Sequence, residues 1–425
     1  MRRSLLLAAI LLSSIATCFA RDVRVAADGT GDFTTVQAAV DSIPENNTQR
    51  VVIAIKNGTY TEQVRIRTPF ITLRGQDRKL TKITSYDNTS ACPVQPGQSA
   101  EEQCATVVAD ATDIVVDNLT IENSYKGPKG KAAALSFMGD STRIAISKVD
   151  IVGFGGNTLG LTARRNSLGD GGEYYLNDVY VSGLWHIIVP RGNAYVANST
   201  FVCLGESMYC LFAEGITRER DKLVIVNSTI ESAKPFKLGS YFRDAAWYFV
   251  DVTFPPTLMP DGQIYHDANK AYRMKWGEGR VFFAGAKGPN YPWLKDNIEQ
   301  SPARTRENVT AAWALPDWNP ESTVAPTIKS IDPHPPLTTR DPAPDAEIKV
   351  IFSESVTVRG MPVLKFGACR MEYLYGSGTD TITFLSDNGK GCTRLNSGVF
   401  QMRDGAIFAS AASLTERNAD LTLPK

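Results

Sequence analysis

The sequence predicts an all-β protein in which a long solenoid of stacked coils precedes a small β-sandwich. Helical periodicity almost vanishes after residue 44, and short β-rich runs take its place. One phrase, a polar residue followed by alternating apolar residues, recurs at intervals of 21 to 30 residues from residue 118 onwards. Near residue 316 the composition changes, with eight prolines between Pro316 and Pro344. These three observations give the fold class and the order of the domains.

Residues 1–20 are predicted to be a signal peptide. Two arginines supply its basic start, an apolar stretch over 5–15 is too short to span a bilayer comfortably, and Ala20 is a small residue at the expected cleavage site. A lipid anchor at Cys18 is the alternative, which the residues on either side of the cysteine disfavour. We therefore expect a secreted protein.

The solenoid, expected over residues 21–315, begins with an extended segment at 23–26 and a glycine-rich turn at 28–31. One short helix should follow over 34–43, with Asp32 as its cap and Pro44 after its last turn. Short strands come next. We expect them at 51–55, 63–66, 71–73, 107–108 and 114–116.

The recurring phrase is the main evidence for a solenoid. A tight turn before a short strand, repeated at this interval, lets each coil bury its apolar side chains by stacking on the next. Asparagine suits such a turn. A β-sandwich is the alternative for this part, but hairpin signals are scarce apart from Asn57-Gly58. The copies begin at Asn118, Lys148, Asn177, Asn198, Asn227 and Asp251.

Cleavage at residue 20 leaves six cysteines, an even number that suggests disulfides in an exported chain. The economical pairing joins neighbours in the sequence, although the sequence leaves other pairings open. A zinc site is the alternative, and no CxxC or HxxxH spacing supports it. The expected pairs are Cys92–Cys104, Cys203–Cys210 and Cys369–Cys392.

Residues 316–344 are predicted to be a proline-rich linker, and residues 345–425 a β-sandwich. The C-terminal part has short strands separated by Gly, Ser and Asn. Its run over 352–364 resembles the bacterial Ig-like modules that are attached to secreted proteins. The strands are expected at 347–352, 357–358, 363–366, 373–375 and 381–384.

The formal net charge of the chain is zero, which argues against a dedicated nucleic-acid binder. It does not exclude an acidic polysaccharide, because a local basic strip is enough to hold one. After the signal peptide, no stretch is apolar enough to span a membrane. We expect a monomer whose partner is a polysaccharide.

Four segments of the solenoid resemble the pectinesterase family. They are the DGTGDF opening at 28–40, the G-x-Y-x-E strand at 51–64, and the segments at 105–108 and 117–124. The resemblance implies a right-handed parallel β-helix that hydrolyses methyl esters on pectin, without a metal or other cofactor. In that family one aspartate is the nucleophile, a second is the acid/base, an arginine positions the nucleophile, and glutamines stabilise the oxyanion.

The positions that match this machinery carry other residues. Lys131 stands in place of a glutamine, Asn157 in place of the acid/base aspartate, His186 in place of the nucleophile, and Ser240 in place of the arginine. Losing even one such group commonly lowers the rate by several powers of ten. The matched phrases are residues 131–135, 153–159, 185–192 and 238–242.

One interpretation of the altered site is a catalytically inactive homologue that binds glycans. Aromatic side chains would stack on sugar rings, although packing in the coil core is the commoner fate of an aromatic residue. Basic side chains would attract uronate carboxylates. The aromatic candidates are Trp185, Tyr241, Phe242 and Trp247, and the basic candidates are Lys131, Arg191 and Arg243.

The other interpretation is an esterase with a changed mechanism. If His186 and Ser240 inherit the adjacency of the family's aspartate and arginine, the histidine would activate the serine as a nucleophile. Lys131 and Asn157 would then donate hydrogen bonds to the oxyanion. This hypothesis requires the His186 and Ser240 side chains to lie within hydrogen-bonding distance.

Overall fold

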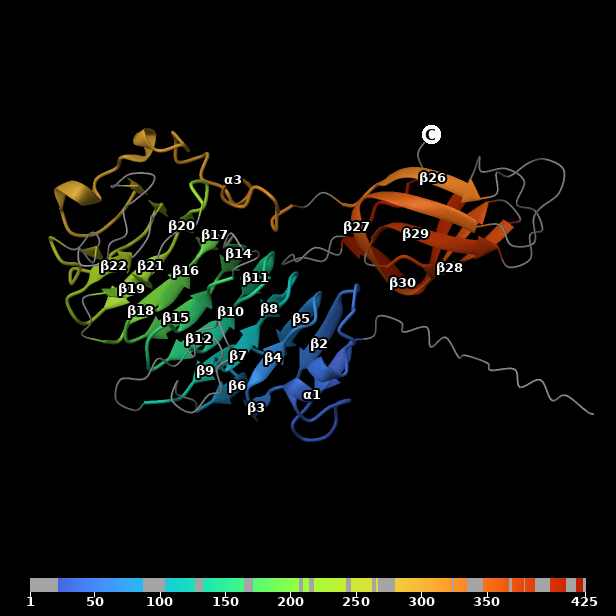
Figure 1. Cartoon of the computed structure of the whole chain (residues 1–425), viewed down its shortest axis with the longest axis horizontal. Coiled ribbons are helices and arrows are strands. Elements are labelled where there is room, and N and C mark those ends of the chain that lie inside the picture. Colours follow the sequence, from blue (N-terminus) through green and yellow to red (C-terminus); the bar gives the residue numbers. More distant parts are fainter. Residues whose placement is uncertain are drawn as a thin grey trace, which may run out of the picture.

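The chain folds as a parallel β-solenoid followed by an antiparallel β domain (Figure 1). The computed structural model describes residues 22–86, 104–126, 133–163, 171–205, 209–213, 218–241, 246–261, 265–266, 280–322, 325–334, 347–366, 369–377, 379–386, 398–409 and 418–422.

Three parallel sheets, here called A, B and C, form the solenoid. In the described part of the chain, sheet A consists of β1 (Val23–Val25), β2 (Val51–Ile55), β5 (Ile71–Gly75), β8 (Val115–Asp117), β11 (Ile144–Ser147), β14 (Gly172–Asn177), β17 (Gly192–Ala197), β20 (Leu223–Val226), β23 (Trp247–Val250) and β25 (Val281–Ala284). Sheet B consists of β3 (Gly58–Thr61), β6 (Thr81–Ser85), β9 (Thr120–Asn123), β12 (Asp150–Gly153), β15 (Tyr180–Gly183), β18 (Thr200–Cys203) and β21 (Thr229–Ser232). Sheet C consists of β4 (Val64–Ile66), β7 (Val107–Ala109), β10 (Leu135–Phe137), β13 (Leu159–Leu161), β16 (Ile188–Pro190), β19 (Tyr209–Ala213), β22 (Lys237–Tyr241) and β24 (Tyr265–His266).

Each coil contributes one strand to each sheet in turn, and strands of successive coils pair in parallel. Apolar side chains of all three sheets meet in one core inside the coils, and many of them, such as Ile53, Leu135 and Ile151, have no exposed surface. A single short strand has only one or two such side chains, so stacking supplies the rest of the core. This arrangement confirms the solenoid predicted from the repeat.

The repeated phrase marks the turn from sheet A to sheet B. Its polar residue adopts the left-handed conformation, in which Asn and Asp are enriched. In the third copy the residue in this conformation is Asp178, one place after the predicted Asn177. The φ angles are 58° at Asn118, 53° at Lys148, 54° at Asp178, 52° at Asn198, 47° at Asn227 and 53° at Asp251. The backbone N–H of each donates to a carbonyl of the next coil, at 2.8 to 3.2 Å.

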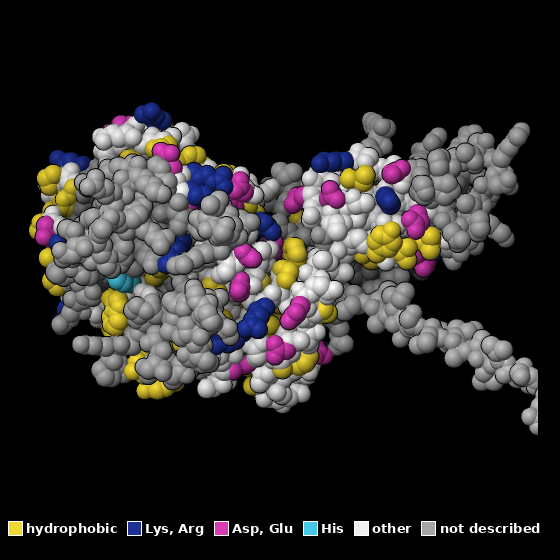
Figure 2. Space-filling model, in the orientation of Figure 1, with side chains coloured by type: hydrophobic (Ala, Val, Ile, Leu, Met, Phe, Trp, Pro, Cys, Tyr) yellow, Lys and Arg dark blue, Asp and Glu magenta, His cyan; other side chains and the backbone are white. Residues whose placement is uncertain are grey.

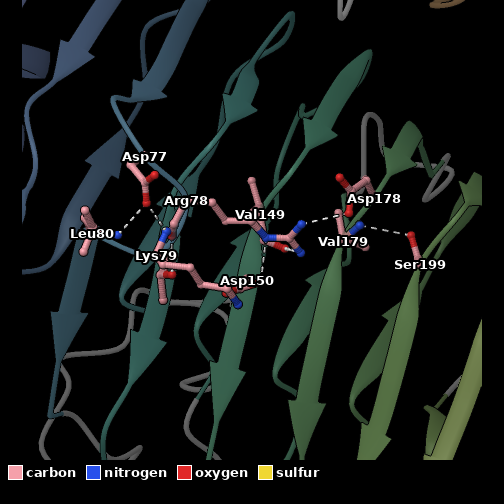
Figure 3. A network of polar contacts seen from close by, with 10 residues as sticks. Asp77, Arg78, Lys79, Leu80, Val149, Asp150, Asp178, Val179 and Ser199 are labelled. Carbon is pink, nitrogen blue, oxygen red and sulfur yellow. Dashed lines mark hydrogen bonds and ion pairs between the residues drawn. The ribbon is translucent and has the colours of Figure 1, made fainter.

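An ion-pair network ties several of these coils together along the same corner (Figure 3). Arg78, which follows β5, donates through Nε to Asp150 at 2.7 Å and through Nη1 to Asp178 at 2.8 Å. Lys79 binds the second oxygen of Asp150. The Asp150 side chain is only 6% exposed, so these two cations compensate a charge that would otherwise be costly to bury.

One helix covers the first coils. Helix α1 (Val36–Asp41) is capped by Thr35, whose side chain accepts from Ala38 N. The prediction that Asp32 caps it is wrong, because Asp32 accepts from Arg24 N instead. Glu62, in the G-x-Y-x-E strand, accepts from the first two helical N–H groups, of Val36 and Gln37, at 2.8 and 2.9 Å. The family motif therefore has a structural role here, which is to complete the helix terminus.

The C-terminal domain is an antiparallel sheet with its own apolar core. Strand β27 is long and irregular, and its two halves pair with different neighbours. The predicted Ig-like identity of the domain stays a prediction. The strands are β26 (Ile328–His334), β27 (Glu347–Phe366), β28 (Cys369–Tyr375), β29 (Thr379–Ser386) and β30 (Gly398–Ala409).

The predicted linker over 316–344 is wrong at both ends. Trp318 and Pro320 are buried, Trp318 against the outer face of sheet A, and β26 already belongs to the C-terminal sheet. The elements before it are η1 (Pro292–Leu294), η2 (Ile298–Gln300) and α3 (Ala311–Ala314). The C-terminal domain touches the first coils, where Thr48 Oγ1 donates to the Ser377 carbonyl at 3.2 Å (Figure 1).

Basic and acidic side chains are interspersed on the face seen in Figure 2, in keeping with the zero net charge. Cys104 and Cys203 are each disulfide-bonded, and their predicted pairing stays a prediction. Cys92, Cys392 and the expected signal peptide, including Cys18, lie outside the described residues. Within those residues, no helix is long and apolar enough to cross a membrane.

Glu173 is a buried carboxyl group on the outer face of sheet A, where residues 311–320 cover it. It is 3% exposed, and its Oε1 accepts a long hydrogen bond of 3.4 Å from Asp317 N. Burial raises the pKa of Glu173 above its ordinary value. Ionisation therefore costs more in the folded than in the unfolded chain, and this cost is present above the unfolded pKa of about 4.5.

Glu173→Gln is accordingly expected to raise the free energy of unfolding at pH 7.5, because the amide carries no charge to bury. The gain should disappear below pH 4.5, where the native carboxyl group is protonated in both states. Urea unfolding at the two pH values measures it. The exposed Glu231→Gln is the matched control and should change neither value. Equal stability of wild type and Glu173→Gln at pH 7.5 would contradict the expectation.

Candidate active site

The candidate site lies at the turn from sheet B to sheet C, where two of the predicted residues stack on each other. Asn157 stands two residues before Leu159 in β13, and His186 stands two residues before Ile188 in β16. Leu159 pairs with Ile188, and Asn157 N donates to the Trp185 carbonyl at 3.2 Å. Asn157 and His186 therefore occupy the same position in adjacent coils, about 5 Å apart along the solenoid axis.

Both residues adopt the left-handed backbone conformation, with φ of 58° at Asn157 and 49° at His186. Asn and His are among the residues enriched there, whereas most others are disfavoured. Both side chains are half-buried, so each is accessible yet held by its surroundings. The turn thus carries a carboxamide and an imidazole at equivalent positions of adjacent coils, and the Asn157 Oδ1 atom is buried.

Trp185 lies beside this pair and is also half-buried. Gly156 pairs with it as an isolated bridge. A Cβ at Gly156 would lie 2.1 Å from the indole Nε1, so only glycine leaves room for the ring. Trp185 therefore lies next to Asn157 and His186, and its predicted role in sugar binding stays a prediction.

Two buried hydroxyl groups near Asn157 and His186 were not predicted from the sequence. Ser136 Oγ in β10 and Thr158 Oγ1 are shielded from solvent, and neither has a hydrogen-bond partner within the described ranges. Ser136 pairs with Gly160 in the next strand. Ser136 could have been found from the sequence. It lies between Leu135 and Phe137, whose side chains point into the core, so its own side chain must point to the outer face of the strand.

Ser240 lies elsewhere on sheet C. It belongs to β22, where its backbone pairs with Ala213 of β19, and the preceding residue of β19, Phe212, pairs with Ile188 in β16. Ser240 is therefore two strands from His186, about 10 Å, and three residues further along the coil. This register argues against a hydrogen-bonded Ser240–His186 pair, and so against the predicted serine–histidine mechanism.

Two predicted substrate-binding residues are buried. Trp247 has no exposed surface and is part of the solenoid core, so the prediction that it is a sugar platform is wrong. Arg191 is 5% exposed, which is too little for a surface charge that attracts uronates. For Tyr241 the structure gives only the backbone, in β22. Lys131, Phe242 and Arg243 lie outside the described residues.

The described residues hold no cluster of three or more His, Cys, Asp or Glu side chains with the spacing of a metal site. The chemistry available at the turn is that of an imidazole, a carboxamide and nearby hydroxyl groups. An imidazole transfers protons near neutral pH, and an amide N–H stabilises a developing oxyanion. This combination is suited to acyl transfer from an ester.

The fold places the chain among parallel β-helix proteins, and solved structures define the class. Pectin methylesterase PemA from Erwinia chrysanthemi matches with a TM-score of 0.55 and 20% identity, over 72% of this chain and 99% of that one. A pectin methylesterase in complex with a hexasaccharide matches with a TM-score of 0.54 and 20% identity, over 71% of this chain and 98% of that one. The right-handed parallel β-helix expected from the resemblance is thereby confirmed.

Sequence comparisons find similarity to one family. The Pectinesterase family model matches residues 22–170. Pectinesterase 31 of Arabidopsis thaliana is 29% identical over 218 residues, which are 49% of this chain and 65% of the relative. Pectinesterase 1 of Olea europaea is 30% identical over 252 residues, which are 57% of this chain and 65% of the relative. The chain thus spans slightly less than two thirds of the length of these relatives, and its N-terminal half is similar to pectinesterases.

Proposed function

We propose that the β-helix hydrolyses methyl esters of pectin or a related plant cell-wall uronan, with His186 and Asn157 as the reacting pair. The match of residues 22–170 to the Pectinesterase family model supports the reaction, and the hexasaccharide bound to a solved pectin methylesterase supports a polysaccharide substrate. The observation that carries the proposal is the stacking of Asn157 on His186 at one turn of adjacent coils. Secretion and a monomeric state stay predictions.

The reaction needs a nucleophile, a proton acceptor and a donor to the oxyanion. In the proposed mechanism the His186 imidazole takes a proton from a water molecule as its oxygen attacks the ester carbonyl. The Asn157 amide donates a hydrogen bond to the carbonyl oxygen, which becomes negative. As the tetrahedral intermediate collapses, the carbon–methoxy oxygen bond breaks and the imidazolium returns the proton, which yields methanol and the free acid.

This mechanism differs from the two-aspartate route that the family resemblance implies. Neither Asn157 nor His186 carries a carboxylate, so no acyl intermediate on an aspartate forms at these positions. Trp185 would stack on a sugar ring next to the ester. The half-buried state of the pair allows a polymer to reach it from the outer surface.

The direct test is methanol release from highly methyl-esterified pectin by the purified full-length protein. We expect steady release that stops when the esters are consumed, and none from fully de-esterified pectin. Retained pectin binding without methanol release would overturn the proposal in favour of a catalytically inactive glycan-binding relative. Pectin binding is measured in the same samples by affinity electrophoresis.

A further inference from the structure

A hollow of about 370 Å³ opens on the outer face of sheet A at the first coils, away from the Asn157–His186 pair on sheet C. The DGTGDF loop forms one side of it, and the ends of β1, β2 and β5 form its floor. Its lining includes Arg24, Ala26, Thr30, Ala54, Lys56 and Arg74. We refer to it as the arginine pocket. Nothing in the proposed ester hydrolysis uses it.

The register of sheet A explains the hollow. Arg24 pairs with Ala54, and Ala54 pairs with Arg74, so one methyl group lies between two long side chains on the same face. Successive strands are about 4.8 Å apart, which leaves a gap of two strand spacings between the arginines. Glycines keep its walls close, because a Cβ at Gly75 would meet the Asn118 carbonyl at 2.3 Å.

The charged residues that line the arginine pocket are all cations, Arg24, Lys56 and Arg74. Their acidic partners stand outside the lining. Arg74 donates through Nε to Asp117 at 3.2 Å, and Arg24 Nε lies 3.6 Å from Asp32. In the part of the chain that the structure describes, the Nη groups of both arginines make no hydrogen bond. Each guanidinium is therefore anchored by one edge and offers the other to a ligand.

We propose that the arginine pocket binds a uronate residue of a de-esterified glycan. Two arginine side chains facing one gap suit a carboxylate, which takes paired N–H donors. The apolar floor at Ala54 suits the C–H face of a sugar ring. The inference rests on the proposed function, since ester hydrolysis creates these carboxylates. The pocket would hold an already hydrolysed stretch of the polymer while sheet C acts on another.

Isothermal titration of the full-length protein with trigalacturonate tests the proposal. We expect wild type to bind the free acid, and the His186→Ala variant, which should not hydrolyse the ester, to bind the trimethyl ester at least tenfold more weakly than the free acid. Ala54→Phe, which fills the hollow, and the double variant Arg24→Ala/Arg74→Ala should each weaken binding at least tenfold. The trigalacturonate affinity of Arg74→Lys should lie between those of wild type and the double variant, because lysine keeps the charge but lacks the paired N–H donors of arginine. Rising salt should weaken wild-type binding.

Arg220→Ala is the matched control, since Arg220 is another half-exposed arginine paired with one carboxylate, and its binding should equal wild type. Thermal unfolding confirms that each variant is folded. The proposal would be overturned if both Ala54→Phe and the double variant bind trigalacturonate as wild type does. It would also be overturned if wild type does not bind trigalacturonate. Binding that Trp185→Ala abolishes while the pocket variants retain it would overturn the proposal too, because the ligand would then occupy sheet C.

The outcome is independent of the esterase test. Ala54→Phe should release methanol from the trimethyl ester at the wild-type rate, because the short substrate does not need the pocket. If wild type releases no methanol and Ala54→Phe still loses trigalacturonate binding, the proposed hydrolysis fails and the pocket stands. If wild type releases methanol and the pocket variants bind trigalacturonate as wild type does, the proposed hydrolysis stands and the proposed uronate binding in the arginine pocket fails.

Discussion

Replacing His186 by alanine should lower methanol release from methyl-esterified pectin by about 10²- to 10⁴-fold, the usual contribution of a general base. The loss follows from the proposed role, in which the imidazole both accepts the water proton and returns it to the leaving group. Asn157→Ala removes one donor to the oxyanion and should cost about 10²- to 10³-fold. Initial rates with saturating pectin measure both.

The stacked geometry supplies the controls. His186 has a φ of 49°, and Asn227, with a φ of 47°, occupies a similar turn at another corner of the solenoid. Asn227→Ala therefore imposes a comparable backbone change and should leave methanol release unaffected. A double variant should lose less than the product of the two single losses, because the two residues act on one step. Full activity of His186→Ala would remove the histidine from the mechanism.

Replacing Trp247 by alanine should destabilise the protein by about 3–5 kcal/mol, the usual cost of truncating a buried Trp. Trp247 has no exposed surface, and its strand β23 pairs with β20 and β25 in sheet A. The cavity would open inside the coils, where the surrounding strands are fixed on both sides and collapse little. Denaturant unfolding measures the loss.

Trp185→Ala is the informative comparison, because Trp185 is half-buried beside the Asn157–His186 pair. Trp185→Ala should lower the free energy of unfolding by less than Trp247→Ala does. It should weaken pectin binding by more. At a temperature where both variants are folded, Trp247→Ala should bind pectin as wild type does. A large loss of pectin affinity in folded Trp247→Ala would show that this residue acts on the ligand after all.

Much of the fold was predictable because its turns leave a trace in the sequence. A left-handed turn recurs once per coil and favours Asn or Asp, so the phrase beginning at Asn118 repeats visibly. Lys148 shows the limit of this signal, since it takes the same conformation without belonging to the favoured types. The linker boundaries failed because proline content does not reveal that Trp318 packs on sheet A.

The candidate site was only partly predictable. The family resemblance named Asn157 and His186 as site positions, but their stacking on each other is seen only in the register of the structure. Trp247 was misplaced because both faces of β23 are buried, Trp247 inside the coils and Tyr248 beneath the segment that contains Trp313. A strand covered on both faces shows no polar alternation, so the sequence cannot tell which side chain reaches solvent.

The left-handed turns also bear on how the protein would respond to mechanical force. Each turn donates one backbone N–H to the next coil, so a coil pulled from the end loses this bond together with the hydrogen bonds of its paired strands. Extension should then proceed in discrete steps, one per repeat of 21 to 30 residues. Each step would lengthen the chain by about 70–110 Å, which optical tweezers resolve as a regular sawtooth.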